Sequence, residues 1–98
     1  MKTIQAVSIW YNGKIDNAIF FNLTCIYDNL FDSATFLYEL KDSTFITIAS
    51  GNLIMVEPDY TTNWNTNNSA YLWAATALNL VITGDYTPPA PVEPIATV

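Results

Sequence analysis

The sequence predicts an α+β fold, in which an antiparallel meander sheet of four or five strands is packed by one C-terminal helix and followed by an extended proline-rich tail. Three observations predict it. Between residues 4 and 56, β-branched and aromatic residues recur in alternating runs separated by turn-forming residues. Residues 69–80 are mostly good helix formers. Four of the five prolines lie between residues 88 and 94, where they exclude a central strand.

A tight hairpin is expected at the start of the chain. Residues 4–11 form the first strand and stop at Asn12-Gly13, a pair that tolerates positive φ and favours a two-residue turn. Residues 14–17 complete the connection, and a long second strand follows. Its apolar face comprises Ile19, Phe21, Leu23, Cys25 and Tyr27. Cys25 has no second cysteine to pair with and no nearby lysine or histidine, so we expect a small core residue.

Two further strands complete the predicted meander. Residues 28–33 form a loop with Asx-turn chemistry around two apolar residues, and residues 34–40 form the third strand. A turn at residues 41–44 leads to the fourth strand, residues 45–56. Gly51 lies inside this strand pattern, which predicts a bulge or bend at residues 50–52.

The only predicted helix comes next. Residues 61–68 form a polar connection with one large apolar residue, Trp64, and Asn67 or Asn68 caps a helix over residues 69–80. This helix has no charged residue and no strongly polar face, and such helices are normally buried on more than one side. A four-stranded sheet covers one side, so we expect a partner surface on the other. Residues 81–83 form a short edge strand that ends at Gly84.

The chain is short enough for one domain, which we place at residues 1–84, with an extended arm at residues 85–98. Proline-rich segments favour the polyproline II conformation, which loses little entropy on docking. The arm therefore either lies along a neighbouring protein or remains a solvated terminus.

Composition excludes most enzyme classes. The chain has three lysines, no arginine, no histidine and nine acidic residues, so its formal net charge is −6. Phosphate-mediated binding of nucleic acid needs a cationic surface, and zinc sites and imidazole bases need histidine. The carboxylate pairs Asp28/Asp32 and Glu57/Asp59 lack the spacing of a calcium loop, and we interpret them as turn caps and solvated charges. We expect no enzyme activity, cofactor, metal or small-molecule substrate.

Membrane and export signals are also not expected. The N-terminal stretch has no continuous apolar segment of the kind that signal peptides contain. Residues 60–84 are uncharged, but their first third is rich in Thr and Asn, and the apolar remainder is too short to cross a bilayer.

Aromatic residues supply the candidate contact sites. Three tryptophans and six tyrosines favour protein contact or carbohydrate stacking, since these side chains bury large areas and keep a polar end. Core packing is the expected role of Trp10 and Trp73, whereas Trp64 either anchors its loop or touches a partner. The candidate protein-contact residues are Trp64, Tyr71, Trp73, Pro88, Pro89, Pro91, Val92 and Ile95.

Several segments carry a resemblance. They are residues 8–13, 20–23, 26–30, 33–36, 49–53, 59–60, 70–75 and 78–80. Their order resembles small proteins encoded in tailed-phage genomes, over most of residues 4 to 82 but not in the proline-rich tail. The resemblance implies a virion component made in the host cytoplasm, such as a capsid decoration, neck, baseplate or fibre element. It carries no catalytic motif and assigns no site residue.

Three hypotheses follow. The first is a structural, oligomeric component of a phage particle that binds copies of itself or other virion proteins. The alternative is a phage-encoded acidic inhibitor that mimics nucleic acid in a basic groove of a host protein. A contiguous acidic face would favour that alternative, and scattered acids would favour solubility. A third hypothesis is a carbohydrate-binding module that uses Trp64 and Tyr60.

Overall fold

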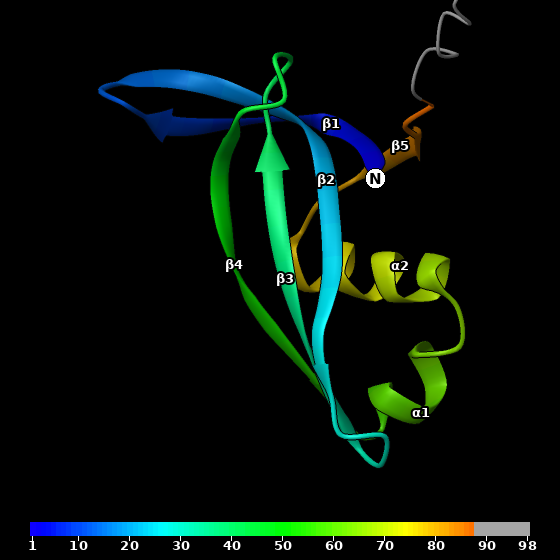
Figure 1. Ribbon diagram of the computed structural model, residues 1–98. Helices are drawn as coiled ribbons and strands as arrows, with labels where there is room; N and C mark the ends of the chain where they lie inside the picture. The colour runs from blue at the N-terminus through cyan, green and yellow to red at the C-terminus, as the bar shows by residue number, and fades with distance from the viewer. Residues whose placement is uncertain (88–98) are drawn as a thin grey trace, which may run out of the picture.

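The computed structural model describes residues 1–87 and contains five strands and two helices in that range. They are β1 (Lys2–Tyr11), β2 (Lys14–Asp28), β3 (Ser33–Lys41), β4 (Thr47–Val56), α1 (Asp59–Asn63), α2 (Asn67–Leu78) and β5 (Ile82–Asp85). The strands form one antiparallel sheet in the order β4-β3-β2-β1-β5, so the predicted α+β meander is confirmed with its fifth strand (Figure 1). The candidate contact residues Pro88, Pro89, Pro91, Val92 and Ile95 lie outside the described residues.

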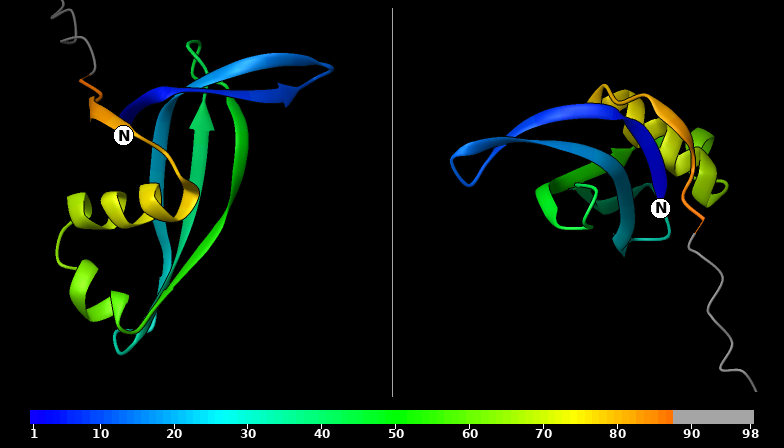
Figure 2. Two further views of the ribbon diagram at one scale, coloured as in Figure 1. Left: turned by 180° about the vertical axis from the view of Figure 1, so that it is seen from behind. Right: turned by 90° about the horizontal axis from the view of Figure 1, so that it is seen from above.

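The predicted hairpin turn is confirmed. Asn12 and Gly13 have φ angles of 53° and 78°, and Tyr11 pairs with Lys14 across a two-residue turn. The predicted connection at residues 14–17 is wrong, because β2 begins at Lys14 directly after the turn. Register between β1 and β2 shifts between Thr3 and Val7. Beyond that shift, residues 8–17 form an arm that extends past the β4 edge of the sheet (Figures 1 and 2).

β4 is shorter and more regular than predicted. The Asp42 carboxylate accepts hydrogen bonds from the backbone N–H groups of Thr44 and Ile46, which holds residues 42–46 in a loop and delays the strand to Thr47. The bulge expected at residues 50–52 is absent, since β4 pairs with β3 without interruption from Ala49 to Val56. The register shift lies at the start of β4, between the pairs formed by Leu40 and Lys41.

The two helices differ from the prediction at their ends. The short α1 replaces part of the expected polar connection, because its first turn is closed by a hydrogen bond from the Thr62 N–H to the Pro58 carbonyl. Thr66, rather than Asn67 or Asn68, caps α2, and its side chain and that of Ser69 form a reciprocal capping box. The helix ends at Leu78 instead of residue 80, because Asn79 adopts the left-handed conformation with φ 59°.

The core lies between one face of the sheet and α2, which crosses in front of the strands in the left view of Figure 2. Phe21, Phe36 and Met55 are the largest fully buried side chains and come from β2, β3 and β4. On α2 the buried residues are three alanines, Ala70, Ala74 and Ala75, whose small size lets the helix backbone approach the sheet closely. Among residues 1–87, no helix is long and apolar enough to cross a membrane.

The other face of β2, β3 and β4 has no helix on it within the described residues (Figure 2). Tyr27, Thr35 and Ile54 occupy one row of paired positions across these three strands. Alternation places Thr35 and Ile54 opposite the helix-covered residues. Tyr27 was predicted on the apolar face with Phe21, but a register shift between Cys25 and Tyr27 turns it to the side of Thr35. We call this side of the sheet the open face.

Candidate interaction surfaces

Two large apolar side chains project from the loop between β2 and β3. Leu30 is 85% exposed and Phe31 is 81% exposed, the highest values among the large apolar residues of residues 1–87. We call residues 29–32 the tip. Exposed apolar side chains of this size are common in contact surfaces, since water is displaced from them when a partner covers them.

Hydrogen bonds hold the tip in one shape. The Asn29 side-chain oxygen accepts from the backbone N–H groups of Phe31, Asp32 and Ser33 at 2.9, 3.0 and 3.0 Å. The Asn29 amide group donates to Asp32 and Ser33, and the Asp28 carboxylate accepts from the Leu30 N–H at 2.8 Å. Every backbone N–H from residue 30 to residue 33 therefore has a side-chain acceptor. The loop presents its apolar side chains without needing to be ordered by a partner.

The backbone at Leu30 is strained. Its φ of 59° lies in the left-handed region, which costs a non-glycine residue about 1 kcal/mol or more. Glycine or asparagine would relieve this strain, and the chain instead keeps a large apolar side chain there. Strain retained with an exposed apolar side chain indicates a role for that side chain beyond folding.

Asp28 joins the tip to the helical side of the molecule. Its carboxylate accepts from the Tyr60 hydroxyl at 2.7 Å and from the Trp64 indole N–H at 2.8 Å. These hydrogen bonds, Trp64 first, lower the pKa of Asp28 below its ordinary value. The hydrogen bond to the carboxylate also raises the pKa of Tyr60 to about 12. Asp28 thus caps the turn at Leu30, as predicted, and is also an internal acceptor instead of a solvated charge.

Trp64 anchors its loop, one of the two roles left open for it. Its ring packs edge-on against Phe36 with ring centroids 5.0 Å apart, and its N–H is bound to Asp28. Trp73 packs on both core clusters and lies 5.8 Å from the same Phe36 ring. Core packing of Trp73 is therefore confirmed.

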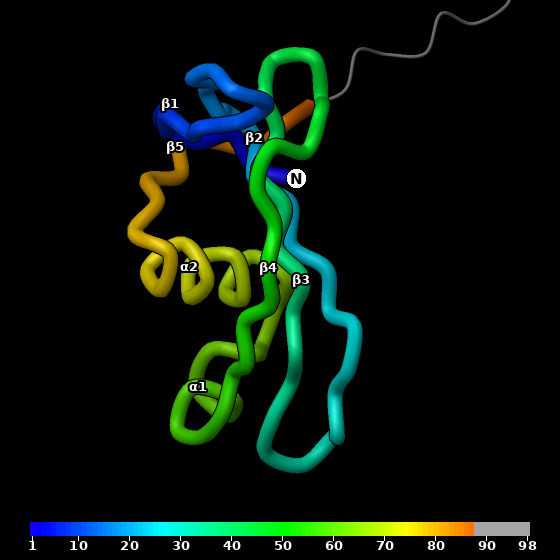
Figure 3. Tube along the Cα trace, turned by 90° about the vertical axis from the view of Figure 1, so that its left-hand side faces the viewer, coloured from blue at the N-terminus to red at the C-terminus, as the bar shows by residue number. Residues whose placement is uncertain are grey.

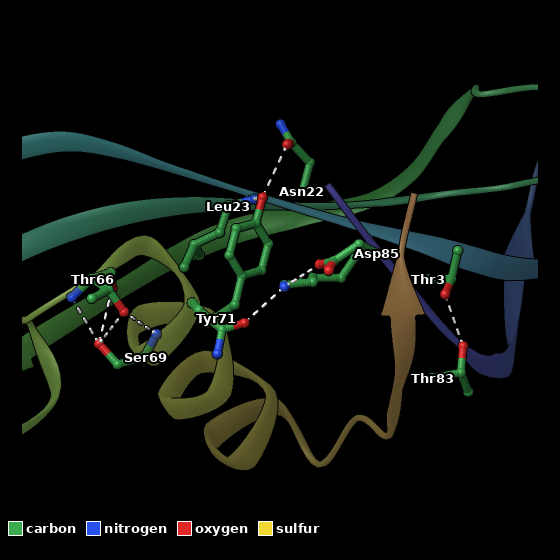
Figure 4. Close-up of polar contacts among 10 residues, drawn as sticks. Thr3, Asn22, Leu23, Thr66, Ser69, Tyr71, Thr83 and Asp85 are labelled. Carbon is green, nitrogen blue, oxygen red and sulfur yellow. Dashed lines mark hydrogen bonds and ion pairs between the residues drawn. The ribbon is translucent and has the colours of Figure 1, made fainter. Parts of the chain in front are cut away.

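Tyr71 points from α2 to the sheet. Its hydroxyl accepts from the Leu23 N–H at 3.0 Å and lies 3.3 Å from the Asn22 side-chain oxygen (Figure 4). Its ring packs edge-on against Phe21, and the Lys2 ammonium lies 5.6 Å from the ring centroid. Trp64, Tyr71 and Trp73 are thus brought to the helix side of the sheet, where they mainly hold α2 in place.

A half-open pocket of about 480 Å³ separates the start of α2 from β2. Cys25, Trp64 and Tyr71 contribute to its wall, and Lys2 lies at its rim, paired with Asp85. Cys25 is exposed, so its predicted burial is wrong. The reason is that α2 covers β2 around Phe21, while Cys25 lies further along β2 where the pocket opens.

The remaining exposed apolar residues lie on the arm and on the open face. Trp10 is 72% exposed, which corrects the expected core position. It pairs with exposed Ile15 on the arm, beyond the part of the sheet that α2 covers. On the open face, Tyr27, Ile54 and Val56 are exposed near the tip.

At the opposite end of the open face, aromatic rings cover one another. Phe45 stacks on Phe20 at 4.8 Å between ring centroids, and Tyr86 packs against both rings. Tyr86, near the start of the predicted C-terminal proline-rich segment at residues 85–98, therefore packs against the sheet.

The tip was missed as a candidate contact site, although its signal was present in the sequence. Residues 28–33 show Asx-turn chemistry around two apolar residues, but the predictions from the sequence assign this loop no function. An apolar pair inside a loop made of turn-forming residues has no core to enter, and this is the pattern that could have identified Leu30 and Phe31.

Comparison with known proteins identifies no relative of this chain. No protein-family model, no curated protein and no solved structure matches the chain.

Proposed function

We propose that this protein is a non-enzymatic structural component of a bacteriophage particle, in which it acts through protein–protein contacts. The observation that carries the proposal is the tip, where Leu30 and Phe31 are exposed on a loop already fixed by hydrogen bonds. The resemblance of the segment order to small tailed-phage proteins is the reason for proposing a phage particle as the assembly that the protein joins. Capsid decoration, neck, baseplate and fibre positions all fit a small domain with an apolar anchor.

The tip suits permanent contact better than catalysis. A rigid pair of apolar side chains gives binding free energy at little entropic cost, and such residues commonly dominate protein interfaces. Fully burying Leu or Phe contributes about 1.5–3 kcal/mol each. Loss of both side chains should therefore weaken particle binding by roughly 100-fold or more.

Acid placement gives the inhibitor alternative no specific support. Asp28 is bound to Tyr60 and Trp64, and Asp85 is paired with Lys2 at the other side of the pocket. Asp42 accepts hydrogen bonds within its own loop, and Glu39 accepts from Thr47 on the open face. These four acids are therefore divided among separate parts of the fold and are already hydrogen-bonded, whereas mimicry of nucleic acid needs a row of free charges.

The test is incorporation into particles. Purified particles of the phage that encodes the chain are analysed by mass spectrometry, and particles lacking the chain are incubated with added protein and sedimented. We expect the wild-type chain to sediment with the particles and the double variant Leu30→Ser/Phe31→Ser to stay in the supernatant. Val81→Ser is the matched control, since Val81 is an exposed apolar residue between α2 and β5, away from the tip. Absence of the wild-type chain from purified particles would refute the proposal.

A further inference from the structure

A second contact surface is the free edge of β4. Among residues 1–87, β4 pairs only with β3 and forms one edge of the sheet. Figure 3 views the molecule from this side, with β4 in front of the sheet and both helices beside it. Alternate backbone N–H and C=O groups of an edge strand have no strand partner, which makes such an edge a template for another strand.

Apart from the arm, which projects past this edge beside the start of β4 (Figures 1 and 3), β4 lacks the features that usually protect an edge. It spans ten residues, Thr47–Val56, with no charged residue and no proline. Natural monomers protect long edges with lysine, proline, bulges or very short strands. The one irregularity in the pairing of β4 lies at its first residues, so the strand is regular from Ala49 to Val56. The other edge strand, β5, has only four residues and carries Asp85.

Charge indicates what covers this edge. The chain has a net charge of −6, so most contacts between two copies would bring acids together. The β4 edge avoids that repulsion because ten consecutive residues are uncharged. In an antiparallel pair, Lys41 of one copy lies at the same end as Glu57 of the other. The reason is that Lys41 pairs with Thr47 at the start of β4, and Glu57 directly follows the last residue of β4. Parallel pairing would instead set Glu57 against Glu57.

We propose that β4 pairs antiparallel with β4 of a second copy, which gives a two-fold dimer with one continuous ten-stranded sheet. A two-fold axis through the middle of β4 makes the contact self-complementary and closed. The exposed side chains of Ile54 and Val56 then lie against the partner strand on the open face. The two tips lie at opposite ends of the dimer, so each dimer offers two anchors. This goes beyond the proposed function and does not require a particle.

Solution mass of the full chain tests the dimer. Size-exclusion chromatography with light scattering, over a wide range of protein concentration, should give the mass of a dimer for the wild type. Ile54→Lys places a cation on the paired strand and should weaken the dimer by roughly 100-fold. Val81→Lys is the control, because Val81 is 52% exposed outside β4 and α2, and Ile54 is 65% exposed on β4. A wild-type monomer at every concentration, or a dimer that Ile54→Lys leaves unchanged, would overturn the proposal.

Cross-linking tests the orientation. In a Cys25→Ser background, single cysteines replace Ser50 or Asn52, which are exposed near the middle of β4. With the two-fold axis at Ser50 or Asn52, that position lies close to its copy; with the axis at Gly51, Ser50 of one copy lies opposite Asn52 of the other. Mild oxidation of the two variants, separately and mixed, should therefore give a covalent dimer. Thr76→Cys on exposed α2 surface is the control and should stay monomeric under denaturing conditions. Absence of cross-linking in the separate and in the mixed samples would refute antiparallel self-pairing.

Hydrogen exchange provides a readout that needs no variant. Exchange of the β4 amides in the wild type should slow as the protein concentration rises, while exchange of the α2 amides stays unchanged. Equal exchange of β4 at low and high concentration would contradict the dimer. Failure of the dimer leaves particle binding through the tip intact, and failure of particle binding leaves the dimer intact, so the two proposals fail separately.

Discussion

Replacement of Gly51 by alanine should destabilise the protein through one identifiable contact. Gly51 pairs with Tyr38 across β3 and β4, and the tyrosine ring lies over the glycine. An alanine Cβ at position 51 would lie 2.6 Å from the Tyr38 Oη atom and 2.8 and 2.9 Å from two ring carbons. These distances are shorter than any normal carbon contact, so the ring must move away from the core that it packs against.

The expected loss of stability is about 1–3 kcal/mol, the usual cost of inserting a methyl group into a well-packed site. For a domain of this size, each kcal/mol corresponds to a shift in Tm of roughly 4–8 °C. Thermal unfolding followed by circular dichroism, with urea titration for the free energy of unfolding, measures both. Gly84→Ala in β5 is the matched control, because its nearest neighbour would be the Thr3 Oγ atom at an ordinary 3.5 Å.

A double-mutant cycle isolates the cause. If the tyrosine ring is the obstacle, Gly51→Ala should cost much less in a Tyr38→Leu background than in the wild type. A glycine needed for a bulge would give the same loss in both backgrounds. Equal losses for Gly51→Ala and Gly84→Ala, within about 0.5 kcal/mol, would refute the close contact with Tyr38.

Three further predictions concern polar side chains. The folded-state pKa of Asp28 lies below its ordinary value of 3.8, so its stabilising effect is complete above that pH and is lost as pH falls through the folded pKa. Asp28→Asn should therefore lower Tm at pH 7 and have little effect near pH 2, and an equal loss at both would contradict this. Asp16 has its pKa raised by its hydrogen bond with Asp42, so an ionised Asp16 opposes folding at neutral pH. Asp16→Asn should raise Tm at pH 7, and the gain should vanish in acid as the wild-type residue is protonated; a variant less stable at pH 7 would count against the pair. Thr66→Ala removes the helix cap and should cost about 1 kcal/mol, whereas Asn67→Ala should change the free energy of unfolding by less than half as much.

Local chemistry explains what could be predicted from the sequence. Asn12-Gly13 specifies a hairpin turn because both residues tolerate positive φ, and the structure uses both. Asn29 specifies the Asx turn because its side chain reaches its own backbone, whatever lies elsewhere in the fold. The alternation of apolar and polar residues identified the strands for the same reason, since it depends only on the two-residue period of an extended chain.

Residues that depend on distant parts of the chain were assigned wrongly. Alternation places Cys25 on the same face as Phe21, but it does not say where along β2 the helix stops covering that face. Trp10 lies on a strand that leaves the sheet as an arm, and no local pattern marks that departure. The glycine at position 51 signalled an exception to regular strand packing, but its cause is Tyr38 on a neighbouring strand.

The distribution of polar side chains explains how an acidic chain can still form apolar contacts. Asp28 and Asn29 direct their hydrogen-bonding groups inward to the loop, to Tyr60 and to Trp64, so the tip presents apolar atoms although it follows Asp28 and contains Asp32. β4 contains no charge at all. The net charge of −6 therefore opposes random association over most of the described surface and leaves the tip and the β4 edge as the places where contact costs least. In the two proposals made above, the same acidic surplus that disfavours nucleic acid would make association selective for these two surfaces.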